Sequence, residues 1–301
     1  MFIKKIFKRL KKIANYRLLN PIIKWANNDR APIKLYSFLF FLGNKNSKNK
    51  IKVDPNFSWI TIKEYINEKE LYWSFFNAFR KRSRMHYSQG LKFRGQEIAE
   101  SYNLDEIKFR KNDLIIDCGA NMGDLWLYFY FLNIPIKYIA IEPGKIEFDT
   151  LKRNLIDSNK SIIEAELFNI ALGDKNKNSE FYYSPNDADS SIIKPSFFSS
   201  IYKIKVLKLD NFVDKYQLKN QRIKLLKLEA EGFEPEIIFG ASNAIKNINY
   251  ISADLGPERG ESSKCTLPEV TNFLLNNGFE IQSINENRLT VLFKNKNQSS
   301  I

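Results

Sequence analysis

The residues Asp113–Asp124, DLIIDCGANMGD, constrain the fold of this chain more than any other stretch of its sequence. The apolar run Leu114–Ile116 ends at Asp117, and a turn that contains Gly119 and Gly123 separates this run from residues that suit a helix. A buried strand that enters a helix through a glycine turn is typical of an α/β sheet. In such a sheet, ligands bind in the crevice at the carboxyl ends of the strands.

The spacing of this turn indicates which kind of ligand it suits. Its glycines stand in the pattern G-A-N-M-G at residues 119–123, whereas dinucleotide sites carry G-x-G-x-x-G beside the pyrophosphate. Glycine lets the backbone turn tightly and lets a ligand approach without a Cβ in the way. We therefore expect an adenosyl group without a pyrophosphate at this turn.

A second carboxylate follows at the end of the next predicted strand. The segment Lys137–Pro143, KYIAIEP, is mostly apolar up to Glu142. This glutamate stands at about the 20-residue distance at which an acidic residue meets a ribose hydroxyl in dinucleotide sites. Asp117 or Glu142 alone would fit a helix cap or a solvated charge. The two together, beside the glycine turn, favour ligand binding.

Five ordered motifs carry a resemblance to a known family. They read DCGANMGD, IEPGKIEFDTLKRNL, FNIALGD, DSS and LLKLEAEGFEPEIIFGA. Together they resemble the FkbM family of S-adenosylmethionine-dependent methyltransferases over about Asp113 to Phe279. The late motif of the family usually reads Asp-Val-Glu-Gly, whereas this chain has Glu229-Ala230-Glu231-Gly232. The resemblance implies an α/β fold: the Rossmann-like, doubly wound sheet of class I methyltransferases, with one antiparallel strand.

The resemblance also implies which residues bind S-adenosylmethionine. They are Asp117, Gly119, Ala120, Asn121, Gly123, Glu142, Pro143, Asn169, Ala171 and Glu229. Asn169 would contact the adenine, although an asparagine also simply favours a turn. Ser190 and Ser191 match a family serine pair near the cofactor, and small hydroxyl residues in a loop are also common turn formers.

Alternating strands and helices beyond residue 113 predict a parallel sheet with helices on both faces. The predicted strands are a run to Cys118, Tyr138–Ile141, Ile163–Ile170, Phe181–Tyr183, Ile204–Leu209, Ile223–Leu228 and Tyr250–Leu255, and a closing hairpin of Phe279–Ile284 and Leu289–Phe293. The predicted helices are Leu125–Leu132, Ile146–Ile156, a segment from Pro235 and Leu267–Leu275.

The net charge of +13 is concentrated at the start of the chain. Residues 1–50 contain 13 Lys and Arg and a single acid, Asp29. Because the remainder is close to neutral, we expect no nucleic-acid partner and predict three parts. These parts are a basic amphipathic arm of residues 1–50, a helical region of residues 51–110 and a methyltransferase domain of residues 111–295.

The arm begins with Met1–Ala14, in which apolar residues at helical spacing alternate with Lys and Arg. This pattern predicts a basic amphipathic helix that docks on an anionic membrane surface or packs on the main domain. Its lysines exclude a signal-peptide core and a transmembrane span. We therefore expect a cytoplasmic protein, with the inner face of the cell membrane as the alternative.

The segment Ile60–Arg84 carries acids early and bases late, which suits a helix macrodipole and predicts a helix. Its aromatic residues favour packing over a substrate platform. The two cysteines, Cys118 and Cys265, do not form a disulfide framework, and one histidine, His86, does not make a structural zinc site. No metal is expected.

The predicted activity is O-methylation, with a sugar hydroxyl of a bacterial surface glycan or its lipid-linked precursor as the acceptor that family habit favours. Two alternatives use the same features. An NAD-dependent oxidoreductase would lack the expected glycine spacing. A non-catalytic, membrane-associated protein would retain only a vestigial cofactor pocket.

Methylation of a hydroxyl needs a group that accepts its proton. In an extended segment, Glu229 and Glu231 would point to the same side and share a proton, which would raise one pKa. Glu231 is the first choice for the base because it matches the family glutamate before glycine, although it would also suit a loop-holding role. The candidate catalytic residues are Glu231, Asp254, His86 and Lys227, the last as a counter-charge.

Overall fold

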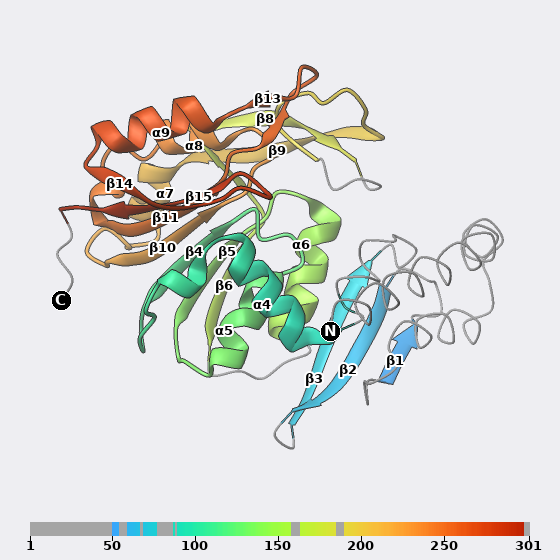
Figure 1. The fold of residues 1–301 in the computed structure, drawn as a ribbon. Coiled ribbons are helices and arrows are strands. Elements are labelled where there is room, and N and C mark those ends of the chain that lie inside the picture. Colours follow the sequence, from blue (N-terminus) through green and yellow to red (C-terminus); the bar gives the residue numbers. More distant parts are fainter. Residues whose placement is uncertain are drawn as a thin grey trace, which may run out of the picture.

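The computed structural model describes residues 50–53, 59–66, 69–76, 87, 89–157, 163–184 and 190–297. The predicted helix Met1–Ala14 and the candidate base His86 lie outside these residues. Figure 1 shows the described part as a central sheet between two layers of helices, with smaller sheets at its margins.

The central sheet has seven strands in the order β14-β15-β11-β10-β4-β5-β6. Its strands are β4 Leu114–Cys118, β5 Lys137–Ile141, β6 Glu164–Phe168, β10 Ile223–Leu228, β11 Ile248–Asp254, β14 Phe279–Asn285 and β15 Thr290–Asn295. Strand β15 runs antiparallel to both of its neighbours, and the other pairs are parallel. The predicted Rossmann-like α/β sheet with one antiparallel strand is confirmed.

Helices cover both faces of this sheet (Figure 1). One layer contains α4 Leu91–Ser101, α5 Asp124–Leu132 and α6 Lys145–Lys152, and the other contains α7 Leu209–Lys215, α8 Glu234–Phe239 and α9 Leu267–Asn276. Along β4, Ile115 faces the first core, whereas Leu114 and Ile116 face the second. Burying each such side chain contributes roughly 1.5–3 kcal/mol. Because both faces are covered, apolar side chains predominate in the central strands β4, β5 and β10.

The remaining strands form three small sheets. These are β7 Ala171–Gly173, β8 Lys177–Tyr183 and β9 Ser200–Lys208 in one sheet, β12 Pro257–Arg259 and β13 Lys264–Cys265 in another, and β1 Lys50–Val53, β2 Trp59–Ile66 and β3 Lys69–Phe76 in the third. The predicted strand Ile163–Ile170 therefore ends earlier, at Phe168, and the chain turns at Asn169 into the separate strand β7.

The predicted helix over Ile60–Arg84 is wrong for its described residues, 60–66 and 69–76, because β2 and β3 form an antiparallel hairpin there. On β3, Leu71, Trp73 and Phe75 are buried at every second position, which is the period of a strand. β-Branched and aromatic residues favour this pleated geometry. Glu70, one of the early acids that suggested a helix dipole, instead pairs across the hairpin with Lys63.

The hairpin is attached to the glycine turn through Asn154. The Asn154 side chain accepts a hydrogen bond from the Ser74 backbone N–H at 2.7 Å and donates to the carbonyl oxygens of Ser74 and Met122, each at 2.9 Å. Trp73 stacks on Trp126 of α5 at a centroid distance of 6.0 Å. The strands before the methyltransferase domain therefore brace the loop that the sequence assigns to cofactor binding.

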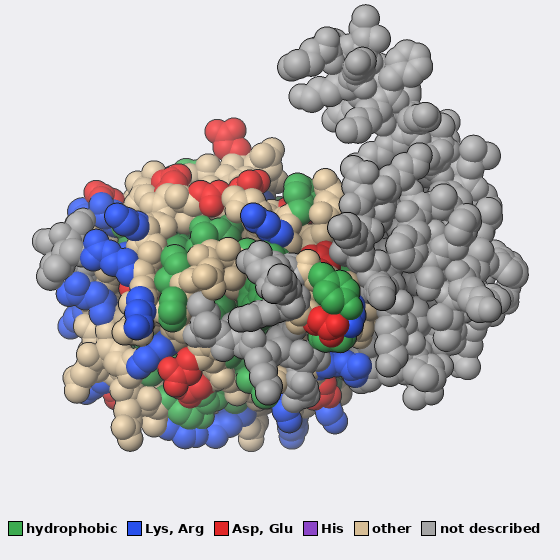
Figure 2. All heavy atoms as spheres, turned by 90° about the horizontal axis from the view of Figure 1, so that it is seen from below, with side chains coloured by type: hydrophobic (Ala, Val, Ile, Leu, Met, Phe, Trp, Pro, Cys, Tyr) green, Lys and Arg blue, Asp and Glu red, His purple; other side chains and the backbone are tan. Residues whose placement is uncertain are grey.

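The surface charge of the described residues is mixed in sign. Figure 2 shows basic side chains with acidic ones between them on one face of the molecule. No helix in the described part of the chain is long and apolar enough to cross a membrane.

Candidate active site

The glycine turn connects β4 to α5 at the carboxyl edge of the sheet. The backbone N–H groups of Gly119 and Ala120 donate to the carbonyl oxygen of Ile141, at 2.9 and 3.1 Å, which ties the turn to the end of β5. Gly119 has a φ of 74°, and a Cβ there would lie 1.8 Å from the carbonyl oxygen of Glu229. Glycine is therefore required because two backbone segments approach closely, whereas the sequence analysis assigned the space to a ligand.

Glu142 lies at the end of β5, against the glycine turn. Its carboxylate accepts hydrogen bonds from the backbone N–H groups of Asn121 and Gly144, both at 2.7 Å. Burial, with a further contribution from the charge of Glu147, raises the pKa of Glu142 to about 8. Because each carboxylate oxygen has a second lone pair, the group retains capacity to accept a hydrogen bond from a ligand hydroxyl.

Asp117 differs from its predicted role. We expected its carboxylate to face the ligand, but the side chain is fully buried. The Tyr138 hydroxyl donates to Oδ2 of Asp117, and Nζ of Lys227 lies 3.1 Å from Oδ1. The carboxylate therefore acts beneath the glycine turn, where it anchors a lysine.

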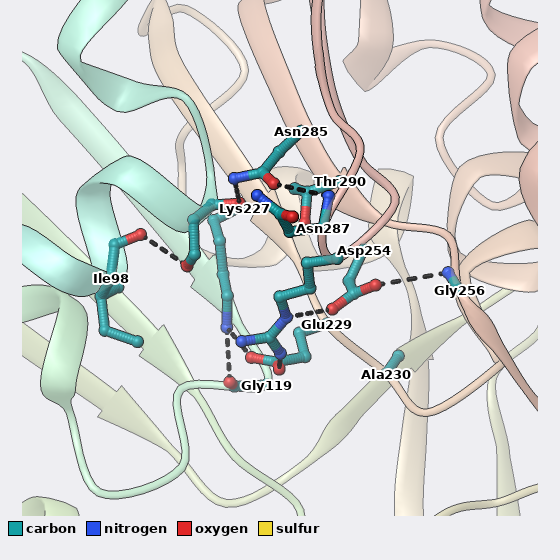
Figure 3. Close-up of polar contacts among 12 residues, drawn as sticks. Ile98, Gly119, Lys227, Glu229, Ala230, Asp254, Gly256, Asn285, Asn287 and Thr290 are labelled. Carbon is teal, nitrogen blue, oxygen red and sulfur yellow. Dashed lines mark hydrogen bonds and ion pairs between the residues drawn. The ribbon is translucent and has the colours of Figure 1, made fainter. Parts of the chain in front are cut away.

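Lys227 on β10 joins the ends of β4 and β10 (Figure 3). Its Nζ donates to the carbonyl oxygen of Gly119 at 2.7 Å and lies 3.1 Å from Asp117 Oδ1 and 3.0 Å from Glu229 Oε2. It also lies 5.2 Å from the centre of the Tyr102 ring. Burial alone would lower the pKa of Lys227, but the two carboxylates outweigh it and raise the pKa, so the ammonium stays charged. The predicted counter-charge is confirmed for Glu229.

Arg288 was missed by the sequence analysis because no motif surrounds it. It comes from the turn between β14 and β15, and its guanidinium pairs with Glu229 and with Asp254 on the next strand. Burial would raise the pKa of Glu229, but Lys227 and Arg288 lower it to about 2. The pKa of Asp254 is raised by burial, against the opposing effect of Arg288. The expected proton sharing between Glu229 and Glu231 is therefore wrong.

Glu231 lies in a turn rather than in an extended segment, because β10 ends at Leu228. Its backbone is left-handed, with a φ of 49°, so the alternation assumed for it does not apply. The Ser191 hydroxyl donates to the Glu231 carbonyl oxygen at 2.9 Å, and Ser190 accepts a hydrogen bond from the Ser184 backbone N–H. The serine pair thus shapes this turn, and the half-buried Glu231 stands at the strand outlet.

Glu234, the first residue of α8, holds the same turn from inside. Its Oε1 accepts the backbone N–H groups of Ala230 and Gly232, at 2.8 and 3.2 Å, and its Oε2 accepts the Thr266 hydroxyl at 3.2 Å. Burial raises the pKa of Glu234 to about 7 against these hydrogen bonds. Among the glutamates that follow β10, Glu234 therefore has a structural role: it holds the turn.

Two further residues predicted to bind the cofactor, Asn169 and Ala171, follow the end of β6. The side-chain amide of Asn169 donates to the carbonyl oxygens of Glu142 and Pro143, at 2.9 and 3.1 Å, which is the turn-forming role that the sequence left open. Ala171 begins β7 and is buried. Among the described residues, no group of three or more His, Cys, Asp and Glu side chains is placed to hold a metal ion.

Comparison with known proteins decides the family. The model of the methyltransferase FkbM domain matches residues 117–281, which is more than half of the chain. The chain belongs to the FkbM methyltransferase family. The methyl donor of the family is S-adenosylmethionine. The match begins at Asp117, includes the glycine turn and Glu142, and ends within β14.

One curated relative is methyltransferase sdnD from Sordaria araneosa. It is 24% identical over 173 residues, which cover 48% of this chain and 66% of that protein. Two solved structures with bound S-adenosylmethionine are also similar. Magnesium protoporphyrin IX methyltransferase from Synechocystis has a TM-score of 0.38 and 9% identity, over 71% of this chain and 80% of that one. Aeropyrum pernix fibrillarin has a TM-score of 0.40 and 10% identity, over 82% and 99%. Similarity this low identifies no acceptor.

We predict that Glu142→Gln changes how stability depends on pH. The pKa of Glu142 rises from 4.5 to about 8 on folding, so the folded state binds more protons between these values and wild-type stability falls as pH rises. The glutamine cannot bind this proton, so the stability of the variant should not fall with pH for this reason. The Tm of Glu142→Gln should therefore rise relative to that of the wild type between pH 5 and pH 8.5. Differential scanning fluorimetry across that range measures it.

The exposed Glu164→Gln, at the start of β6, is the matched control and should show no such trend. A constant Tm difference between Glu142→Gln and the wild type across the range would contradict the burial of an ionisable group at this position.

Proposed function

We propose that this FkbM-family chain is an S-adenosylmethionine-dependent O-methyltransferase that acts on a sugar hydroxyl of a bacterial surface glycan or its lipid-linked precursor. The observation that carries the cofactor assignment is Glu142, a buried carboxylate joined by a hydrogen bond to the glycine turn at the carboxyl edge of the sheet. This carboxylate suits the hydroxyls of a ribose. The acceptor class rests on the resemblance alone.

The residues at the strand ends fit this donor. S-adenosylmethionine supplies a methyl group on a sulfonium cation. The five charged side chains Asp117, Lys227, Glu229, Arg288 and Asp254 form an alternating series with one more negative than positive charge. A cationic ligand is favoured beside such a series. We propose that Glu142 orients the ribose and that the series favours the cation.

Glu231 remains our proposed general base. A sugar hydroxyl needs a proton acceptor within hydrogen-bond reach as it attacks. Glu229 is a poor acceptor because Lys227 and Arg288 hold its pKa at about 2. Asp254 is 1% exposed and paired with Arg288. Glu231 is half-buried at the outlet of β10, where an acceptor would meet the methyl group.

We further propose that the basic arm of residues 1–50 contacts the membrane in which a lipid-linked acceptor would be anchored. If the acceptor is carried on a lipid, the cations of Met1–Ala14 would hold the enzyme at the inner face of the membrane, at roughly 1 kcal/mol for each Lys or Arg near an anionic surface. This arrangement would place a cytoplasmic enzyme beside its substrate.

Calorimetry with the full chain tests the cofactor. We expect S-adenosylhomocysteine to bind and NAD to show no heat of binding, because the turn lacks the pyrophosphate glycine pattern. Methyl transfer from labelled S-adenosylmethionine to a cell-envelope fraction then tests the activity. Binding of NAD alone would favour the oxidoreductase, and binding without transfer would favour a non-catalytic protein.

We predict that Glu231→Gln lowers turnover about 10²–10⁴-fold, because the amide keeps the shape but accepts no proton. Its affinity for S-adenosylhomocysteine should stay near that of the wild type. Glu261→Gln, at an exposed position shortly after β12, is the control. Normal turnover of Glu231→Gln together with loss of activity in His86→Asn would move the base to His86.

A further inference from the structure

Arg288 reaches the site from a part of the chain that the cofactor motifs do not include. It lies in the turn of residues 286–289, between β14 and β15. The turn is tight: the backbone N–H of Asn287 donates to the Asn285 side chain at 3.1 Å, and Leu289 is left-handed, with a φ of 56°. The Leu289 carbonyl oxygen accepts the backbone N–H of Leu255, which closes the turn onto the end of β11.

The same turn is fastened to the end of α4. The side-chain amide of Asn285 donates to the carbonyl oxygen of Glu100 at 3.1 Å, where the helix ends and leaves carbonyl groups without helical partners. The amide of Asn103 in turn donates to the Thr290 carbonyl oxygen at 3.5 Å. Figure 3 shows Asn285, Asn287 and Thr290 above the charged cluster. The backbone that carries Arg288 is therefore fixed from two sides.

The guanidinium itself connects two strand ends. Nε of Arg288 lies 2.6 Å from Asp254 Oδ2, and Nη2 contacts Glu229 Oε1. Its Cζ lies 5.4 Å from the centre of the Tyr102 ring, which Lys227 also contacts. A planar guanidinium can bridge two carboxylates in fixed directions, which an ammonium group cannot do.

The charges around Arg288 require such a bridge. Glu229 and Asp254 lie at neighbouring strand ends, and Glu258 lies two residues beyond Gly256, whose backbone N–H donates to Asp254. Like charges so close oppose ionisation of one another. Lys227 contacts Glu229 on its far side but makes no ion pair with Asp254 in the described structure. Arg288 is therefore the cation that Asp254 shares with Glu229.

We propose that Arg288 is a positioning residue of the methyl-transfer site: it locks Glu229 and Asp254 together as ionised side chains and so fixes the β10 and β11 outlets that flank the acceptor. This role rests on the proposed methyltransferase function. Arg288 is 39% exposed at its side chain, so it also closes the buried cluster toward solvent. The β14–β15 turn thereby becomes part of the active site.

The test compares Arg288→Gln and Arg288→Lys with the wild type by two readouts. In Arg288→Gln, the rate of methyl transfer to the cell-envelope fraction at saturating S-adenosylmethionine should fall by about 10²-fold. This is the order expected when the reacting groups are displaced. The acid limb of its pH–rate profile should move to higher pH, because both carboxylates lose a cation and their pKa values rise. Arg288→Lys should return the acid limb part of the way to its wild-type pH, because a positive charge is present again. Its turnover should stay low, because an ammonium group does not replace the planar guanidinium between Glu229 and Asp254.

The second readout does not need turnover. Carbon-13 NMR of labelled Asp and Glu should show the titrations of Asp254 and Glu229 at higher pH in Arg288→Gln, and unchanged titrations in the control Arg222→Gln, an exposed site before β10. Unmoved titrations, or moved titrations with wild-type turnover and pH profile, would overturn the proposal. If the titrations move in Arg288→Gln but the wild-type protein transfers no methyl group to the acceptor, the proposed O-methyltransferase activity is refuted instead.

Discussion

The side chain of Lys227 is almost entirely buried between the ends of β4 and β10, and a buried ammonium group is tolerated only with anionic or carbonyl partners. It has them in the carboxylates of Asp117 and Glu229 and in the carbonyl oxygen of Gly119. The glycine turn of β4 and the outlet of β10 are therefore fixed to each other by one cation. The ion pair of Glu229 with Arg288 and the hydrogen bond of the Gly119 N–H to Ile141 both continue from that junction.

The junction extends in both directions along the edge of the sheet. Toward β5, the backbone of the glycine turn is bonded to Ile141, and its Asn121 N–H to Glu142. Toward β11, Glu229 continues the series of charges through Arg288 to Asp254. The cofactor side and the acceptor side of the proposed site are thus parts of one polar network. A substitution at either end of this network should change the effect of a substitution at Lys227, because members of one ion-pair network do not act independently.

The sequence predicted well the features that depend on local pattern. The strand–turn–helix at Asp113–Asp124, the alternation that follows it and the carboxylate of Glu142 all appear where the pattern placed them. At Ile60–Arg84 the order of charges predicts a helix, whereas the buried apolar side chains follow the two-residue period of a strand, and burial decides the structure. That period was already visible in Leu71, Trp73 and Phe75.

The remaining differences depend on contacts between residues far apart in sequence. Whether Asp117 faces a ligand or a lysine is decided by β10, which pairs with β4 in the folded sheet. Arg288 approaches Glu229 only because β14 and β15 fold back against β11. Nothing in the neighbours of Arg288 along the chain records this approach. Strand order can be expected from family resemblance, but the partners of individual side chains cannot.

The free energy of unfolding of Lys227→Met, measured by urea denaturation, tests the central role of Lys227 most directly. We predict a loss of about 3–5 kcal/mol, because the methionine fills the space but leaves buried carboxylates without their cation. Lys224→Met, on the same strand but without these partners among its described contacts, should change the value by less than about 1 kcal/mol. A Lys227→Met protein within about 1 kcal/mol of the wild type would contradict the account.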